Sequence, residues 1–142
     1  MVASVLFVQN PEPIFQAGFA KIAATRMKGL PICRTDIHVK ALGFRPWRDY
    51  WVGAVVTPWA IFTVAAHRRP VTTMLQAGQE TTVIMPAGEF SFLAVREPLI
   101  GYYLSCSLMS PLTSIKDQRT AEAFAATCLT HFFNPTANRS TP

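Results

Sequence analysis

The chain has 142 residues, a length that fits one ordinary domain able to bury a sizeable core without disulfides or metal. Half of the residues are hydrophobic and only 15% are charged, a balance that excludes intrinsic disorder. The formal net charge is +5, but the basic residues are scattered and no nucleic-acid-binding signature accompanies them, so we expect no nucleic acid partner.

The first expected element is a helix that begins at Asn10-Pro11, because Asn is a good N-cap and Pro is favoured in the first helical turn. Apolar residues at helical spacing give it one buried face, and it should end near Gly29. A second amphipathic helix is predicted over residues 114–133, and residues 134–142 are predicted to form a flexible polar tail.

The segment between the two helices is predicted to consist of strands and short turns. The expected strands cover residues 37–44, 51–56, 60–65, 81–85, 89–95 and 101–108. Pro58 predicts a bulge or bend between the second and third strands, because proline cannot donate to a strand ladder. The uncharged run over residues 50–66 is too short for a transmembrane helix and contains that proline, so we expect buried strand and no stable membrane insertion.

Short turns favour antiparallel pairing of neighbouring strands. The sequence therefore predicts an α+β fold: a two-layer sandwich of one mainly antiparallel sheet, with the N- and C-terminal helices packed on one face. Residues 1–133 are expected to form this single domain.

The sequence offers little catalytic or metal-binding chemistry. His38, His67 and His131 fall in separate expected elements, and no nucleophile elbow or phosphate-binding loop occurs. Carboxylates are not paired on an apolar strand face, so general acid–base catalysis is not indicated. We expect no enzyme activity, no cofactor and no metal.

Three cysteines, without a Cys-x-x-Cys spacing, argue against a disulfide framework or a zinc site. They point instead to a reducing compartment, the cytoplasm, and the N-terminus does not resemble a signal peptide. Alternation places Cys106 on an apolar strand face, which predicts a buried thiol with a raised pKa. Cys128 lies on the apolar stripe of the second helix, and Cys33 is expected to be exposed in a loop.

Three segments, in order, resemble motifs of one protein family. They read Trp51-Val-Gly-Ala-Val-Val-Thr-Pro-Trp59, Pro86-Ala-Gly-Glu-Phe-Ser-Phe92 and Tyr103-Leu-Ser-Cys-Ser-Leu-Met-Ser-Pro111. The sequence is similar to the HybE/HupJ/HoxT type of [NiFe]-hydrogenase assembly chaperones across residues 10–133. The resemblance implies an accessory role in maturing an uptake hydrogenase, by binding a small or large subunit precursor during assembly and before export, with other maturation factors as further partners.

The family offers no catalytic residue to transfer, so the expected partner contacts come from the residues themselves. A Ser-Pro after a strand fixes a turn and leaves polar groups available, and an exposed aromatic side chain makes a good anchor. The predicted contact residues are Thr57, Pro58, Trp59, Ser107, Met109, Ser110 and Pro111, with Arg68 and Arg69 as a second, basic group.

Two alternatives remain open at this point. The chain could serve as a chaperone or adaptor for another exported protein on the same fold. It could also be a small redox accessory protein that uses Cys33 or Cys106.

Overall fold

The computed structural model describes residues 6–70 and 74–136. The first helix, α1, spans Glu12–Ala24 and follows Asn10-Pro11 as predicted, with the Asn10 carboxamide oxygen accepting the Glu12 N–H at 3.0 Å. Phe15, Phe19 and Ile22 recur at helical spacing and are buried, which confirms the predicted apolar face. The helix ends before the turn that contains Gly29, a residue with positive φ.

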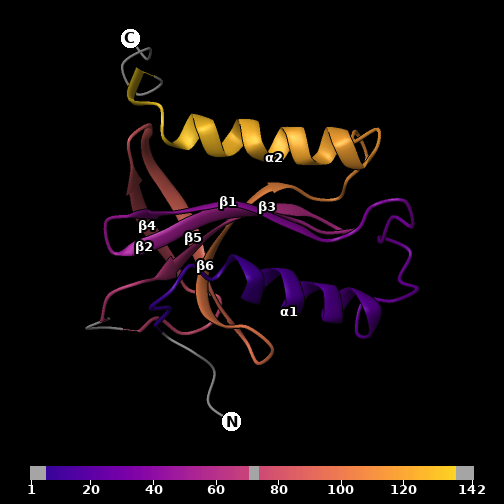
Figure 1. Cartoon of the computed structure of the whole chain (residues 1–142), viewed down its shortest axis with the longest axis horizontal. Coiled ribbons are helices and arrows are strands. Elements are labelled where there is room, and N and C mark those ends of the chain that lie inside the picture. Colours follow the sequence, from indigo (N-terminus) through magenta and orange to yellow (C-terminus); the bar gives the residue numbers. More distant parts are fainter. Residues whose placement is uncertain (1–5, 71–73, 137–142) are drawn as a thin grey trace.

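One six-stranded antiparallel sheet forms the centre of the molecule (Figure 1). Its strands are β1 (Lys40–Trp47), β2 (Tyr50–Val56), β3 (Ile61–His67), β4 (Glu80–Met85), β5 (Gly88–Glu97) and β6 (Gly101–Met109). The strand order is β1-β2-β3-β6-β5-β4, so two three-strand meanders meet where β3 pairs with β6. This arrangement confirms the predicted α+β class with an antiparallel sheet.

Strand β1 begins and ends three residues later than predicted, and it continues through Pro46, where a turn was expected. Pro46 lies opposite Trp51 of β2, and β1 is the edge strand of the sheet. Proline is tolerated at an edge, since its missing N–H can fall on the side that has no partner strand.

The second helix, α2, spans Gln118–Phe132 and starts four residues later than predicted. Asp117 caps it: one carboxylate oxygen accepts the Thr120 N–H at 2.8 Å, which lowers the pKa of Asp117. The predicted tail lies largely outside the described residues, which end at residue 136.

The two helices pack on opposite faces of the sheet, so the prediction that they share one face is wrong (Figure 1). Phe15 and Phe19 of α1 pack with Val55 and Phe62. Ala121 and Ala125 of α2 pack with other sheet residues, Ala54, Val56 and Ile61. The molecule therefore has three layers, with the sheet between its helices.

The physical reason lies in β2 and β3, where both faces need cover. Residues 52–56 of β2 are all buried, and residues 61–66 of β3 are all buried. Because neighbouring side chains of a strand point to opposite faces, a continuous buried run requires a layer on each side. In the sequence, the uncharged run over residues 50–66 is the pattern that indicates cover on both faces.

Side chains from both helices cover the exposed edge of the sheet near β1. Gln16 donates to the Val39 carbonyl at 3.0 Å and accepts the Ala41 N–H at 2.7 Å. Gln118 of α2 bonds both backbone groups of His38, at 2.9 and 3.2 Å. These amides occupy backbone groups of residues 38–41, so a further strand could not pair with the start of β1.

Candidate protein-binding surface

The turn between β2 and β3 is held by Thr57. Its backbone N–H and its hydroxyl both donate to the Ala60 carbonyl, at 2.9 and 2.7 Å, and the hydroxyl accepts the Ala60 N–H at 3.0 Å. The Thr57 side chain is fully buried. Thr57 therefore shapes the predicted bend and presents no side chain to a partner.

Pro58 and Trp59 form the tip of this turn, as the bend prediction required. Pro58 is buried and its carbonyl accepts the Arg34 N–H at 2.9 Å. Trp59 is half-buried, with its ring centroid 6.4 Å from that of Phe19 on α1. Trp59 thus packs on the core with one side and faces solvent with the other.

The structure brings the second predicted segment to the same end of the sheet. Met109 at the end of β6 lies opposite Ile61, the first residue of β3 after the turn. Ser107, Ser110 and Pro111 are exposed, and Met109 is half-buried. We call this end of the sheet, formed by residues 58–59 and 107–111, the bend end.

Arg68 and Arg69 lie at the other end of β3 and do not belong to the bend end. Arg68 donates to the Arg48 carbonyl at 2.7 Å and lies over the Trp51 ring, and Arg69 pairs with Asp49 at 3.6 Å. Because a strand rises about 3.3 Å per residue, the seven residues of β3 separate the two groups by roughly 20 Å.

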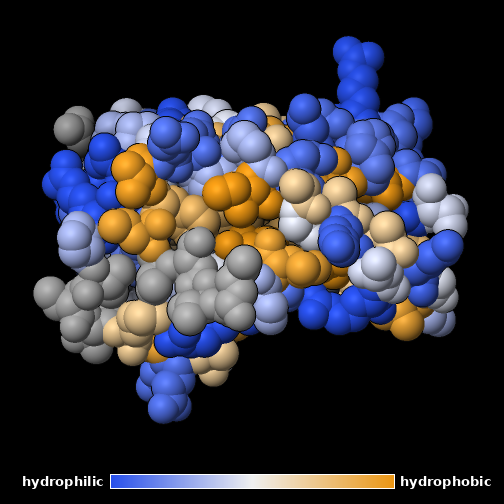
Figure 2. Space-filling model, turned by 60° about the horizontal axis from the view of Figure 1, so that its bottom comes forward, coloured by the Kyte–Doolittle hydropathy of each residue, from blue (hydrophilic) through white to orange (hydrophobic). Residues whose placement is uncertain are grey.

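Two shallow hollows flank Pro58 and run along α1. The larger, of about 450 Å³, is lined by Ala20, Ala23 and Ala24 of α1 and by residues 37–39. The smaller, of about 250 Å³, is lined by residues 27–30 and 33–35. The α1 side of the molecule carries apolar surface bordered by hydrophilic residues (Figure 2).

Arg34 fixes the loop beside these hollows, a role that the sequence analysis missed. Its guanidinium donates to the carbonyls of Leu112, Ile115 and Lys116 at 2.9, 2.5 and 3.2 Å, and it also pairs with Asp36. The hydrogen bonds from Arg34 lower the pKa of Asp36. This arginine therefore ties the segment after α1 to the segment before α2, a contact between positions about eighty residues apart that no local pattern reveals.

The thiols show the predicted tendency toward the neutral form. Cys106 and Cys128 are half-buried, less than predicted, and this partial burial raises the pKa of Cys106, as expected, and also that of Cys128. Cys33 is half-buried, more than predicted, and its thiol donates to the Met27 carbonyl at 3.3 Å. A raised pKa makes the Cys106 thiol a poor nucleophile, which argues against a redox role for this residue.

Within the described part of the chain, no group of three or more His, Cys, Asp or Glu side chains is placed to hold a metal ion. Over residues 6–70 and 74–136, no helix is both long and apolar enough to cross a membrane.

His67 is a half-buried titratable group and gives a pH prediction. Its ring stacks on Tyr102 at 5.8 Å and lies 5.1 Å from Tyr50. Burial lowers the pKa of His67, with a smaller opposing effect from Asp49. The unfolded chain therefore binds a proton below about pH 6.5, where folded His67 is still neutral. We expect His67 to decrease the free energy of unfolding as the pH falls below this value.

This expectation can be checked by urea denaturation between pH 7.5 and pH 5, on the wild type and on His67→Phe. Phenylalanine keeps the stacking and removes the titration, so the variant should lose less stability on acidification. Equal losses in both proteins would contradict the assignment to His67.

Comparison with known proteins defines the class of this protein. Residues 10–142 match the family model described as "[NiFe]-hydrogenase assembly, chaperone, HybE". The chain is 32% identical to the hydrogenase expression/formation protein HupJ of Bradyrhizobium diazoefficiens, over 86% of this chain and 71% of HupJ. It is 31% identical to the protein HoxT of Cupriavidus necator, over 80% of this chain and 70% of HoxT. The fold and these relatives define an assembly chaperone.

The solution structure of HybE from Escherichia coli shares the fold, with a TM-score of 0.74 and 24% identity over 100% of this chain and 89% of that one. The chain belongs to the HybE family of [NiFe]-hydrogenase assembly chaperones. The resemblance stated from the three sequence motifs is thereby confirmed.

Proposed function

We propose that this chaperone binds a hydrogenase small or large subunit precursor in the cytoplasm, during assembly and before export. The observation that carries the proposal is the family match, which spans residues 10–142. The names of two relatives support it, since HupJ of Bradyrhizobium diazoefficiens and HoxT of Azotobacter vinelandii are both described as hydrogenase expression/formation proteins. The fold presents apolar surface for such a partner, and the family is one of chaperones and not a catalytic family.

The bend end and its flanking hollows form the contact surface in this proposal. Trp59 supplies a half-buried aromatic side chain beside hollows of about 450 and 250 Å³ that share Pro58. Aromatic anchors next to apolar pockets are typical of protein interfaces. Arg68 and Arg69 would form a separate contact, because a partner must span the length of β3 to reach both ends.

Affinity capture tests the proposal. Tagged protein is produced with the hydrogenase subunits encoded beside its gene, under low oxygen, and the eluate is identified by mass spectrometry. We expect recovery of a hydrogenase subunit precursor. Recovery of neither subunit would overturn the proposal, and recovery of a different exported protein would favour the alternative of an adaptor for that protein.

A pair of matched variants tests the surface. Ala20 and Ala17 are both exposed on α1, but Ala20 lines the hollow beside Pro58, whereas Ala17 lies on the opposite flank, near Leu99. Ala20→Glu places a charge in the proposed contact and should reduce capture, and Ala17→Glu should not. Equal capture by both variants would exclude the hollow from the interface.

A further inference from the structure

The sheet divides between β5 and β6. Pairing of these strands runs from Glu97 opposite Gly101 to Leu93 opposite Ser105 and stops there. Beyond this point, residues 88–92 continue as β5 and pair with β4, and residues 106–109 continue as β6 and pair with β3. The two stretches diverge toward the bend end, and we call the space between them the fork.

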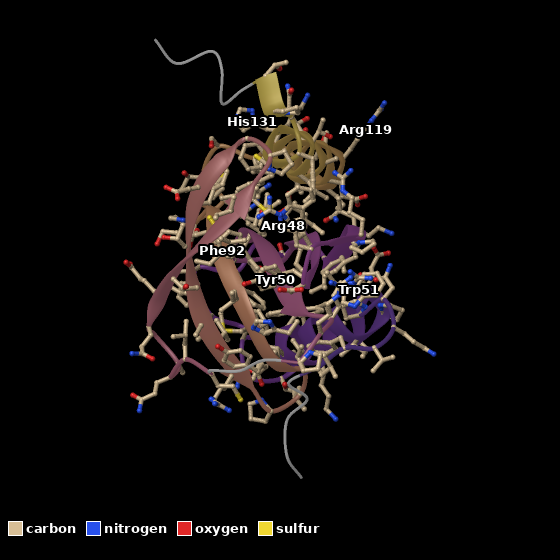
Figure 3. The ribbon with its side chains drawn as sticks, turned by 90° about the vertical axis from the view of Figure 1, so that its left-hand side faces the viewer. Arg48, Tyr50, Trp51, Phe92, Arg119 and His131 are labelled. Atoms are coloured by element: carbon tan, nitrogen blue, oxygen red, sulfur yellow. The ribbon has the colours of Figure 1, made fainter. Side chains whose placement is uncertain are left out.

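Contacts at the tip of the β4–β5 hairpin explain the divergence. Ala87 donates to the Phe132 carbonyl at the end of α2 at 3.1 Å, and the rings of Phe90 and Phe132 lie 4.4 Å apart. The hairpin therefore bends toward α2, as Figures 1 and 3 show, while Met109 of β6 stays opposite Ile61 of β3.

The fork exposes backbone groups of both strands. On β5, the N–H and C=O of Ala94 bond to Gln79 and Gly78, on the side of β4. By alternation the odd-numbered residues Glu89 and Ser91 direct their backbone groups toward β6. Leu93 likewise faces β6 and lies opposite Ser105, so the backbone groups of Ser105 face β5 and, by alternation, those of Ser107 face the fork. No strand of the described residues pairs with Glu89, Ser91 or Ser107 on this side.

The side chains on the α2 side of the fork are apolar and half-buried. They are Phe90 of β5, Cys106 and Leu108 of β6, and Phe124 and Cys128 of α2. Gln118, on one flank of α2, bonds to His38 just before β1. Phe124 and Cys128 lie on the opposite flank of the helix, toward β6. Burial keeps both thiols neutral, so no charge lies on this apolar surface.

We propose that the fork receives an extended segment of the hydrogenase subunit precursor, which adds to the sheet as a strand between β5 and β6. The inference rests on the proposed function and names how its partner is held. Exposed backbone donors and acceptors on both sides recognise an extended chain, as in other cases of strand addition. Alternate residues of the segment would be apolar and pack on the side chains on the α2 side, and the residues between them would face solvent beside the exposed Ser91 and Ser107.

Two proline substitutions, one at the fork and one at the outer edge of β4, test this inference. Ser107→Pro removes the N–H that faces the fork, and a proline is tolerated where no ladder bond is lost. Thr82→Pro is the matched control: Thr82 is exposed on the edge strand β4 and lies opposite Ser91, whose backbone groups face away from β4, so the Thr82 N–H points away from β5. Ser107→Ala removes the hydroxyl but keeps the backbone N–H, so it distinguishes the contribution of the side chain from that of the backbone.

We expect precursor capture to fall at least about tenfold in Ser107→Pro, since one lost ladder position and its neighbours cost on the order of 1.4 kcal/mol or more. Capture by Thr82→Pro should match the wild type, and Ser107→Ala, which keeps the N–H, should lose less capture than Ser107→Pro. Equal capture by Ser107→Pro would overturn the fork as the binding site and leave the proposed function in place. Failure of the wild type to capture either subunit would overturn both.

Amide hydrogen exchange keeps the test decisive if Ser107→Pro does not fold. In the wild-type complex, the amides of Glu89, Ser91 and Ser107 should exchange more slowly than in the free protein, because they become hydrogen-bonded. A complex in which these three amides exchange at unchanged rates would overturn the inference.

Discussion

Replacing Phe15 with alanine is expected to lower the free energy of unfolding by about 3–5 kcal/mol, the usual cost of removing a buried aromatic ring. Phe15 is fully buried in α1. Its ring contacts four others, with centroids at 6.0 Å for Phe7, 6.4 Å for Phe19, 5.3 Å for Phe44 and 5.0 Å for Tyr103. The loss is a large part of the roughly 5–15 kcal/mol that stabilises a typical domain.

Urea denaturation of the variant measures this loss, and Ile14→Ala is its control. Ile14 precedes Phe15 on α1 and is 44% exposed, so its truncation should cost less than about 1 kcal/mol. If Phe15→Ala were no more destabilising than Ile14→Ala, the α1 side would not hold the tightly packed aromatic cluster described here.

Gly53→Ala is expected to destabilise the protein by about 1–3 kcal/mol through overpacking. Gly53 lies in β2, and a Cβ atom built on it would overlap the Phe44 ring. The ring cannot easily move, because it is buried and stacks on Phe15. This glycine belongs to the W-x-G segment, and close approach of an aromatic ring gives that position its physical reason.

A double variant separates overpacking from other effects of this substitution. Phe44→Leu reduces the volume above Gly53, so the added methyl group should cost less in the Phe44→Leu background than in the wild type. Thermal or urea unfolding of the wild type, the two single variants and the double variant gives the coupling free energy between positions 44 and 53. Additive losses would show that the methyl group at position 53 does not act through Phe44.

The proposed contact surface also differs from what its sequence motif indicates. Thr57, Pro58 and Trp59 adjoin in sequence, yet the Thr57 hydroxyl is used within the turn, Pro58 is buried, and Trp59 alone is half-exposed. The hollows beside Pro58 are lined by α1 and by residues 27–39, which no motif brought to attention. The interface that we propose therefore depends on how α1 lies against the turn.

The sequence by itself determined the elements and their order. Helical spacing of Phe15, Phe19 and Ile22 and the turn at residues 86–88 are local signals, and the structure has both elements as predicted. Strand alternation and helical spacing also indicated that Cys106 and Cys128 lie on apolar faces, where they are half-buried, because these periods fix which side chains share a face. Three short motifs were enough for the family.

Only the tertiary structure decided three features: the placement of α1 and α2 on opposite faces, the hydrogen bonds from Arg34 to the segment before α2, and the fork between β5 and β6. Each of these depends on contacts between segments far apart in the chain. A pattern of side chains indicates that a face must be covered, but it does not state which helix covers it. The fork arises because Ala87 and Phe90 contact the end of α2 while β6 remains paired with β3. Both contacts join segments far apart in the chain, so the local spacing of residues does not predict them.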